Sequence, residues 1–84
     1  MRVEFLGIPR ERAGVPELEL DAETLGQLLV VLERKFPSLR GIVDSGRLSP
    51  ACRANLNGDR FVSDPRTRFS AGDCLLILSA DAGG

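Results

Sequence analysis

The sequence predicts an α+β fold in which one amphipathic helix packs on one face of a mixed β-sheet of four to five strands. The first observation is length, because 84 residues suffice for one domain with a small core. The second is a single long helical pattern in the first half of the chain. The third is a set of short apolar segments at both ends of the chain, each bounded by turn residues. We therefore expect residues 1–84 to form one domain.

Two short strands are expected before the helix. Residues 1–8 are apolar enough for a strand, with Val3 and Phe5 on one face. Residues 9–16 are polar and bracketed by two prolines, which predicts a loop. Residues 17–20 alternate Glu and Leu, which predicts a second strand paired with the first in a hairpin.

The helix has both a start signal and a stop signal. Thr24 is a favourable N-cap residue, and Gln27, three residues later, completes a capping box. Pro37 ends the pattern because it disfavours helical geometry in the residue before it. The apolar positions follow helical spacing and predict one stripe that faces a sheet. These positions are Leu25, Leu28, Leu29, Leu32 and Phe36.

The second half of the chain supplies the remaining strands. Residues 38–50 give only a weak apolar cluster, consistent with a short turn of helix. Residues 52–56 alternate and predict a strand, after which Asn57-Gly58 predicts a tight hairpin turn into a return strand at residues 61–62. The last strand, residues 74–78, is continuously apolar, as expected for a strand buried at the centre of a sheet. This order of elements predicts a β-grasp topology with the first and last strands parallel.

Composition argues against several classes of function. The net charge is −1, so no overall positive field attracts nucleic acid or an anionic membrane. No apolar run reaches the roughly 18 residues of a membrane span, and the N-terminal residues do not fit a signal peptide. The sequence also lacks histidine, the commonest acid–base group near neutral pH. We therefore expect a cytoplasmic protein that is not an enzyme and binds neither nucleic acid nor membrane.

Cys52 and Cys74 are the only cysteines. They do not predict a zinc site, because zinc normally takes four nitrogen or sulfur ligands and the chain has no histidine. Both occupy hydrophobic strand positions. The sequence therefore predicts two unpaired thiols.

The C-terminal segment is the one candidate for chemistry. Residues 79–84 predict a flexible tail after the last strand, with Asp81 and Ala82 as part of its spacer. Gly83 and Gly84 lack a Cβ atom, so they permit close approach of the backbone in a narrow channel. The functional interpretation is an arm that delivers the Gly84 carboxylate into the active site of a partner. The simpler alternative is a frayed terminus without a role.

The last strand also predicts a surface for a partner protein. Leu76 and Leu78 face the side opposite to Leu75 and Ile77, and only one of the two sets can pack on the helix. The other set, together with Leu6 of the first strand, would form an exposed apolar patch, and such patches usually mark interfaces. We assign Leu6, Leu76 and Leu78 to this surface. The alternative is that the segment before the third strand covers it.

Several short motifs occur in a characteristic order along the whole chain. They are Arg10-Glu11 and Gly14 after the opening strand, the Thr24-capped helix ending at Phe36-Pro37, Leu56-Asn57-Gly58, Ala71-Gly72-Asp73 before the last strand, and the terminal Gly83-Gly84. In this order the chain resembles the MoaD/ThiS family of ubiquitin-like sulfur carrier proteins. It is most similar to the small subunit of molybdopterin synthase.

The resemblance implies a mechanism and a set of partners. An E1-like enzyme would use ATP and Mg²⁺ to adenylate the Gly84 carboxylate, and sulfur from a donor would then displace AMP to leave a thiocarboxylate. The carrier would bind no cofactor tightly, and would act as a co-substrate for a synthase large subunit or another sulfur-accepting enzyme. Molybdopterin is the expected destination, with thiamine, cysteine or another sulfur-containing metabolite as alternatives. A different class of function remains open, a ubiquitin-like interaction module that never carries sulfur.

Overall fold

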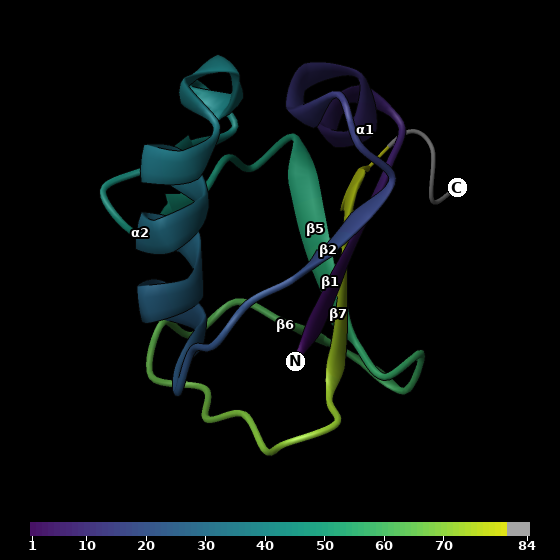
Figure 1. Ribbon diagram of the computed structural model, residues 1–84, viewed down its shortest axis with the longest axis vertical. Helices are drawn as coiled ribbons and strands as arrows, with labels where there is room; N and C mark the ends of the chain where they lie inside the picture. The colour runs from purple at the N-terminus through teal and green to yellow at the C-terminus, as the bar shows by residue number, and fades with distance from the viewer. Residues whose placement is uncertain (81–84) are drawn as a thin grey trace.

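The chain folds into a five-stranded β-sheet with the longest helix against one face and a small helix over one end (Figure 1). The structure is a computed structural model and describes residues 1–80. A two-stranded ribbon packs beside the longest helix. In chain order the elements are β1 (Arg2–Leu6), α1 (Ile8–Ala13), β2 (Glu17–Glu19), α2 (Leu25–Lys35), a 3₁₀ turn η1 (Pro37–Leu39), β3 (Val43–Asp44), β4 (Arg47–Leu48), β5 (Cys52–Leu56), β6 (Arg60–Val62) and β7 (Cys74–Ser79).

The parallel pair of β1 and β7 forms the centre of the sheet. The strand order is β2-β1-β7-β5-β6, with β2, β5 and β6 paired antiparallel to their neighbours. Val3 lies beside Leu75 and Phe5 beside Ile77, and these four side chains are buried on the face that α2 covers. The predicted β-grasp topology, the parallel pairing of the first and last strands and the burial of one face are confirmed.

Helix α2 begins and ends close to the predicted positions. The Thr24 hydroxyl accepts a hydrogen bond from the Gln27 backbone N–H at 3.2 Å, as predicted for the N-cap. The Gln27 side chain accepts from the Glu23 N–H at 2.6 Å, so the box closes one residue before its usual position. Four leucines of the predicted stripe are buried and Phe36 packs against them, its ring 6.1 Å from that of Phe5.

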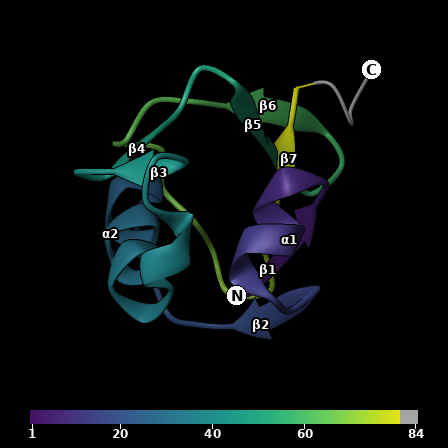
Figure 2. The same ribbon diagram turned by 90° about the horizontal axis from the view of Figure 1, so that it is seen from above.

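The prediction of a loop at residues 9–16 was wrong, because α1 occupies most of this segment. Pro9 stands in the first turn of α1, where a missing N–H leaves no helical hydrogen bond unmade. Gly14 ends the helix with a φ of 78° and donates from its N–H to the Arg10 carbonyl at 3.0 Å. A proline that was interpreted as a loop signal therefore starts a helix. Seen from above, α1 lies across one end of the sheet (Figure 2).

Residues 37–50 form η1 and the ribbon of β3 and β4. Leu39 and Val43 are each 1% exposed and belong to the core shared with α2. The prediction of a short helical turn is confirmed by η1, whereas the ribbon was not predicted. Because this segment packs on the side of α2, it does not cover the opposite face of the sheet.

Asn57 and Asp73 join the β5–β6 turn to the turn that precedes β7. The Asn57 and Gly58 backbones have φ values of 58° and 68°, which suit a tight hairpin turn. The Asn57 amide oxygen accepts from the Cys74 N–H at 2.8 Å, and its NH₂ donates to Asp73 Oδ1 at 3.0 Å. The Ser70 N–H donates to Asp73 Oδ2 at 2.8 Å. The Ser70 N–H and then the Asn57 amide hold the pKa of the Asp73 carboxyl below its ordinary value.

Asp73→Ala should therefore lower stability in a way that depends on pH. A carboxyl with a depressed pKa stabilises the fold above its unfolded pKa, and this contribution is lost as the pH falls through the folded pKa. The variant should unfold at lower urea than the wild type at pH 7, and the gap should narrow below about pH 4. Asp59→Ala, in the same turn region, is the matched control and should change little. An equal gap at pH 7 and at about pH 2.5 would contradict the role of the ionised carboxylate.

Candidate functional site

The face of the sheet that points away from α2 is called the open face here. The strand register places Leu6 of β1, Leu78 of β7 and Arg53 of β5 side by side on it. One step along the strands, Leu76 lies between Glu4 and Asn55. The structure thus brings together the three leucines assigned to a partner surface.

The three leucines differ in exposure, and the expectation that Leu78 is exposed was wrong. Leu6 is 41% exposed and Leu76 is half-buried, but Leu78 is only 5% exposed. The physical reason is its central place, because Leu6 and Arg53 flank Leu78 from the two neighbouring strands. The Arg53 guanidinium in turn stacks on the Phe61 ring, with its carbon 4.0 Å from the ring centre. Leu78 therefore packs beneath its neighbours and exposes little surface of its own to a partner.

Ile8 extends the exposed apolar surface at the end of the sheet. It is the first residue of α1 and 48% exposed, whereas the adjacent Pro9 is buried. Helix α1 contacts both β1 and β7, and it lies at the end where β7 finishes (Figure 1). We use the name open-face patch for Leu6, Ile8, Phe61, Leu76 and Leu78. The patch reaches the end of the sheet at which the chain leaves β7.

The end of β7 is firmly tied to the sheet. Ser79 is 8% exposed and lies beside Cys52, and the Ala80 N–H donates to the Ala51 carbonyl at 2.8 Å. The predicted tail of residues 79–84 therefore begins too early, since Ser79 belongs to the strand. The site residues Asp81, Ala82, Gly83 and Gly84 lie outside the described residues.

Charged side chains border the open-face patch on the β1–β2 side. The Arg2 guanidinium is 3.0 Å from the Glu4 carboxylate and 3.6 Å from that of Glu17. These pairs are exposed, so they add little stability. A polar border around an apolar centre is the usual arrangement of a protein interface.

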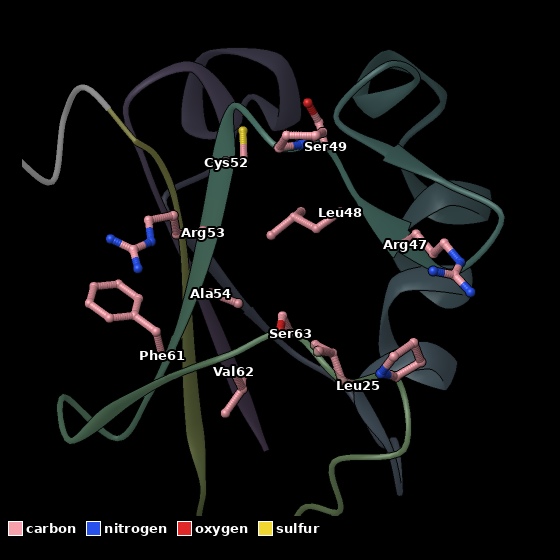
Figure 3. Close-up of a pocket in the computed structure, with 12 residues that line it drawn as sticks. Leu25, Arg47, Leu48, Ser49, Cys52, Arg53, Ala54, Phe61, Val62 and Ser63 are labelled. Atoms are coloured by element: carbon pink, nitrogen blue, oxygen red, sulfur yellow. The ribbon is translucent and has the colours of Figure 1, made fainter.

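A pocket lies on the other side of the sheet, between β5, β4 and the start of α2. Its volume is about 320 Å³. Figure 3 shows Leu48 and Ala54 pointing into it, whereas the guanidinium groups of Arg47 and Arg53 point away. A ligand site normally adds a few convergent polar groups to an apolar pocket. The lining includes the polar side chains of Ser49 and Ser63. We place the candidate site at the open face instead, because the apolar side chains there lie at the end of the sheet where β7 finishes.

The remaining side chains offer little chemistry. Within residues 1–80, His, Cys, Asp and Glu side chains do not gather into a group of three or more that could hold a metal ion. Both cysteines are free, as predicted, and burial raises the pKa of the Cys52 thiol. Over the same residues no helix has the length and apolar character needed to cross a membrane.

Sequence reasoning missed two members of the open-face patch. Ile8 was assigned to the end of a strand, and only the discovery of α1 places it on the surface. Phe61 could have been found, because alternation with Val62 in the return strand puts one of the two on each face. The pairing of Asn55 with Phe61 selects Phe61 for the open face.

Solved structures show where this fold has been seen before. Neither a protein-family model nor a curated protein sequence matches the chain. Small archaeal modifier protein 1 of Methanosarcina acetivorans superposes with a TM-score of 0.80 at 28% identity, over 99% of this chain and 94% of that one. A chain of the BexX/CysO complex of Amycolatopsis orientalis gives a TM-score of 0.78 at 24% identity, over 99% of this chain and 98% of that one. Molybdopterin-converting factor of Helicobacter pylori, a complex of subunits 1 and 2, gives 0.70 at 23%, over 99% and 96%.

The burial of Leu78 makes a prediction about stability. Leu78→Ala should destabilise the protein by about 2–3 kcal/mol, because it removes buried methyl groups and leaves a void between β1 and β5. Leu6→Ala should cost less than about 1 kcal/mol, since that side chain is already partly in water. Urea unfolding of both variants measures the difference. Equal losses would show that the two leucines share one environment, contrary to their exposures.

Proposed function

Because the chain is a MoaD/ThiS-like protein with the ubiquitin-like β-grasp fold, we propose that it is a sulfur carrier whose working group is the Gly84 carboxylate. The observation that carries the proposal is the position of the open-face patch. Leu6 and Ile8 expose apolar surface at the end of the sheet where β7 finishes. A partner docked there would meet the start of the tail.

The chemistry requires an activated carboxyl group. A terminal carboxylate is ionised at neutral pH and is a poor electrophile. Its oxygen attacks the α-phosphate of ATP in the active site of an E1-like enzyme, and pyrophosphate leaves. A sulfur nucleophile then attacks the Gly84 carbonyl carbon, the bond to the phosphate oxygen breaks, and AMP departs. Mg²⁺ offsets the phosphate charge, so the carrier itself needs to supply no acid, base or metal.

The fold suits the delivery of such a tail. Strand β7 is held by β1 on one side and by β5 on the other up to Ser79, so the point where the tail starts is fixed relative to the open-face patch. A segment of four residues spans at most roughly 14 Å when fully extended. A docked enzyme can therefore find the carboxylate within a small volume, which lowers the entropic cost of the reaction.

The solved neighbours are consistent with protein partners, both for activation of the carrier and for acceptance of the sulfur. One neighbour is a complex of CysO with BexX and another a complex of the two subunits of molybdopterin-converting factor. We propose an E1-like activating enzyme, a sulfur donor and a sulfur-accepting synthase subunit as the partners, in the cytoplasm. Molybdopterin is the proposed destination, with thiamine, cysteine or a related metabolite as alternatives. An interaction module without sulfur transfer would use the same patch but not the carboxylate.

Thiocarboxylate formation at Gly84 is the test of the proposed function. With a cognate E1-like enzyme, ATP, Mg²⁺ and a sulfur donor, intact-protein mass spectrometry should show one oxygen replaced by sulfur. Deletion of Gly84 shortens the tail by about 3.5 Å, and a misplacement of 1 Å can lower a rate by roughly 100-fold, so activity should be nearly lost.

Asp81→Ala is the matched control for the deletion, because it changes the tail without moving the carboxylate. It should retain most of the activity. Extension of the chain beyond Gly84 should abolish activation unless a protease trims the added residues. An unchanged rate in the deletion variant would refute the assignment of Gly84, and failure with every plausible activating enzyme would favour the interaction module.

Leu6→Asp tests the docking surface separately from the chemistry. Loss of an apolar anchor at an interface costs about 2 kcal/mol, which is roughly a 30-fold weaker Kd for the activating enzyme. Ala71→Asp adds the same charge in the turn before β7, at the opposite end of that strand, and should leave Kd unchanged. Calorimetric titration compares the two variants once circular dichroism shows both to be folded. Wild-type affinity in the folded Leu6→Asp variant would remove the patch from the interface.

A further inference from the structure

The Asn57-Gly58 turn places a side-chain amide next to an unhindered backbone nitrogen. Asparagine loses its amide most easily when glycine follows, because glycine has no side chain to hinder the attack of its nitrogen on the asparagine Cγ. Both residues are exposed, so water and base reach them. The chain has one other asparagine, Asn55, which precedes the bulky Leu56. The turn is therefore the place in this sequence that favours deamidation.

The fold binds Asn57 to the start of β7 by three hydrogen bonds. Its backbone N–H donates to the Cys74 carbonyl at 2.8 Å. The Cys74 N–H donates to Asn57 Oδ1 at 2.8 Å, and Asn57 Nδ2 donates to Asp73 Oδ1 at 3.0 Å. We use the name Asn57 contacts for these three bonds. Both polar atoms of the amide are thus bound to residues 16 and 17 positions later in the chain.

The Asn57 contacts keep the amide away from the Gly58 nitrogen. Ring closure requires Cγ of Asn57 to turn towards that nitrogen, whereas both polar atoms of the amide are bonded to the start of β7. The Asp73 carboxylate is a charged acceptor, and hydrogen bonds to charged groups are the stronger kind. The positive φ values of the two turn residues, 58° and 68°, further fix the backbone around the reacting atoms. The folded turn therefore opposes a reaction that its sequence favours.

We propose that Asn57 is a latent modification site, which becomes aspartate or isoaspartate only when the Asn57 contacts break. The Gly58 nitrogen loses its proton to base in the solvent and attacks Cγ of Asn57. A carbon–nitrogen bond forms, the bond from Cγ to Nδ2 breaks, and Nδ2 takes a proton from water and leaves as ammonia. Water then adds to either carbonyl of the cyclic imide and opens the ring. The product carries a carboxylate at residue 57, in an aspartyl or an isoaspartyl linkage.

Refolding does not restore the original contacts after this reaction. In the aspartyl product an oxygen takes the place of Nδ2, which lies 3.0 Å from Asp73 Oδ1. Two carboxylates at such a distance disfavour each other's ionised form, so the pKa of the pair rises. The isoaspartyl product adds a methylene group to the backbone of a turn that has two central residues. Either product weakens the connection between the β5–β6 turn and the start of β7.

The rate of deamidation in the folded chain tests the proposal, and the test involves neither a partner enzyme nor a reaction at Gly84. The full chain is incubated at mildly alkaline pH, folded in one sample and unfolded by guanidinium chloride in another. Tandem mass spectrometry of the tryptic peptide 54–60 locates the modified residue. Deamidation of Asn57 should be at least about tenfold faster in the unfolded chain, because the hydrogen bonds of its amide are absent there. Asn55, in the same peptide, should stay intact in both samples.

Three variants separate release of the amide from a general loss of stability. Asp73→Ala removes the acceptor of Nδ2 and should raise the rate in the folded chain about tenfold, the factor expected for one lost hydrogen bond to a charged group. Asp73→Asn keeps an uncharged acceptor, so its rate should lie between those of the wild type and Asp73→Ala. Leu78→Ala is the matched control, because it destabilises the fold and leaves the Asn57 contacts in place. It should deamidate at the wild-type rate, once circular dichroism shows all three variants to be folded.

Two results would overturn the proposal. One is a folded wild type in which Asn57 deamidates as fast as in the unfolded chain. The other is a rate in Leu78→Ala equal to that in Asp73→Ala, since unfolding of the whole domain would then control the reaction.

Asn57→Asp reproduces the aspartyl product and tests its effect on the fold. It should unfold at lower urea than the wild type at neutral pH, because two carboxylates then face each other. A carboxyl whose pKa is raised in the folded state destabilises the fold above that pKa, so the difference should shrink as the pH falls and a proton is bound. Equal urea midpoints at neutral pH would show that the aspartyl product keeps the connection to β7 intact, contrary to the proposal.

Discussion

The parallel pairing of β1 with β7 is the constraint on which the rest of the structure depends. Two strands from the ends of the chain can lie parallel and adjacent only if everything between them crosses over the sheet and returns. Helix α2 makes that crossing and buries Val3, Phe5, Leu75 and Ile77 beneath it. The same pairing places β7 in the middle of the sheet, so the chain leaves the fold from its most firmly held strand.

Because α2 covers only one face of the sheet, the other face is exposed. The two parts of this open face differ in polarity. Along the β1–β2 side, Arg2 is paired with two glutamates and the surface is polar. Toward the end of β7, apolar side chains remain in contact with water at Leu6 and Ile8. Polar side chains in this region would reduce the exposed apolar surface and so favour solubility. This difference in polarity between the two parts of the open face is the one that the proposed docking of a partner at the end of β7 requires.

Stability and binding are assigned to different residues of one small patch. Leu78 lies under its neighbours and holds β1, β7 and β5 together on the open face, whereas Leu6 meets solvent. Arg53 covers part of this surface through its stem and stacks on Phe61. The two leucines are neighbours in register and identical in chemistry. Their exposures differ because Leu78 has neighbours on both sides, Leu6 and Arg53, whereas the pairing of β1 with β2 covers only residues 2–4 and leaves Leu6 with a neighbour on one side.

The sequence by itself determined the fold class, the boundaries and cap of α2, the face of β7 that enters the core, and the unpaired state of both cysteines. These features depend on local periodicity or on turn chemistry, which neighbouring residues encode directly. The Gly84 assignment also came from sequence alone, and it remains a prediction because that residue lies outside the described part of the chain.

Only the tertiary structure decided the placement of α1, the packing of residues 37–50 and the depth of Leu78. Pro9 is compatible with a loop and with the first turn of a helix, and the contacts of α1 with β1 and β7 select the helix. The alternation of residues in β7 predicts the face on which Leu78 lies, but it does not predict the exposed fraction of its side chain. That fraction depends on Leu6 and Arg53, which belong to strands far away in sequence. Exposure is a property of neighbours in space, and the sequence of one strand does not contain them.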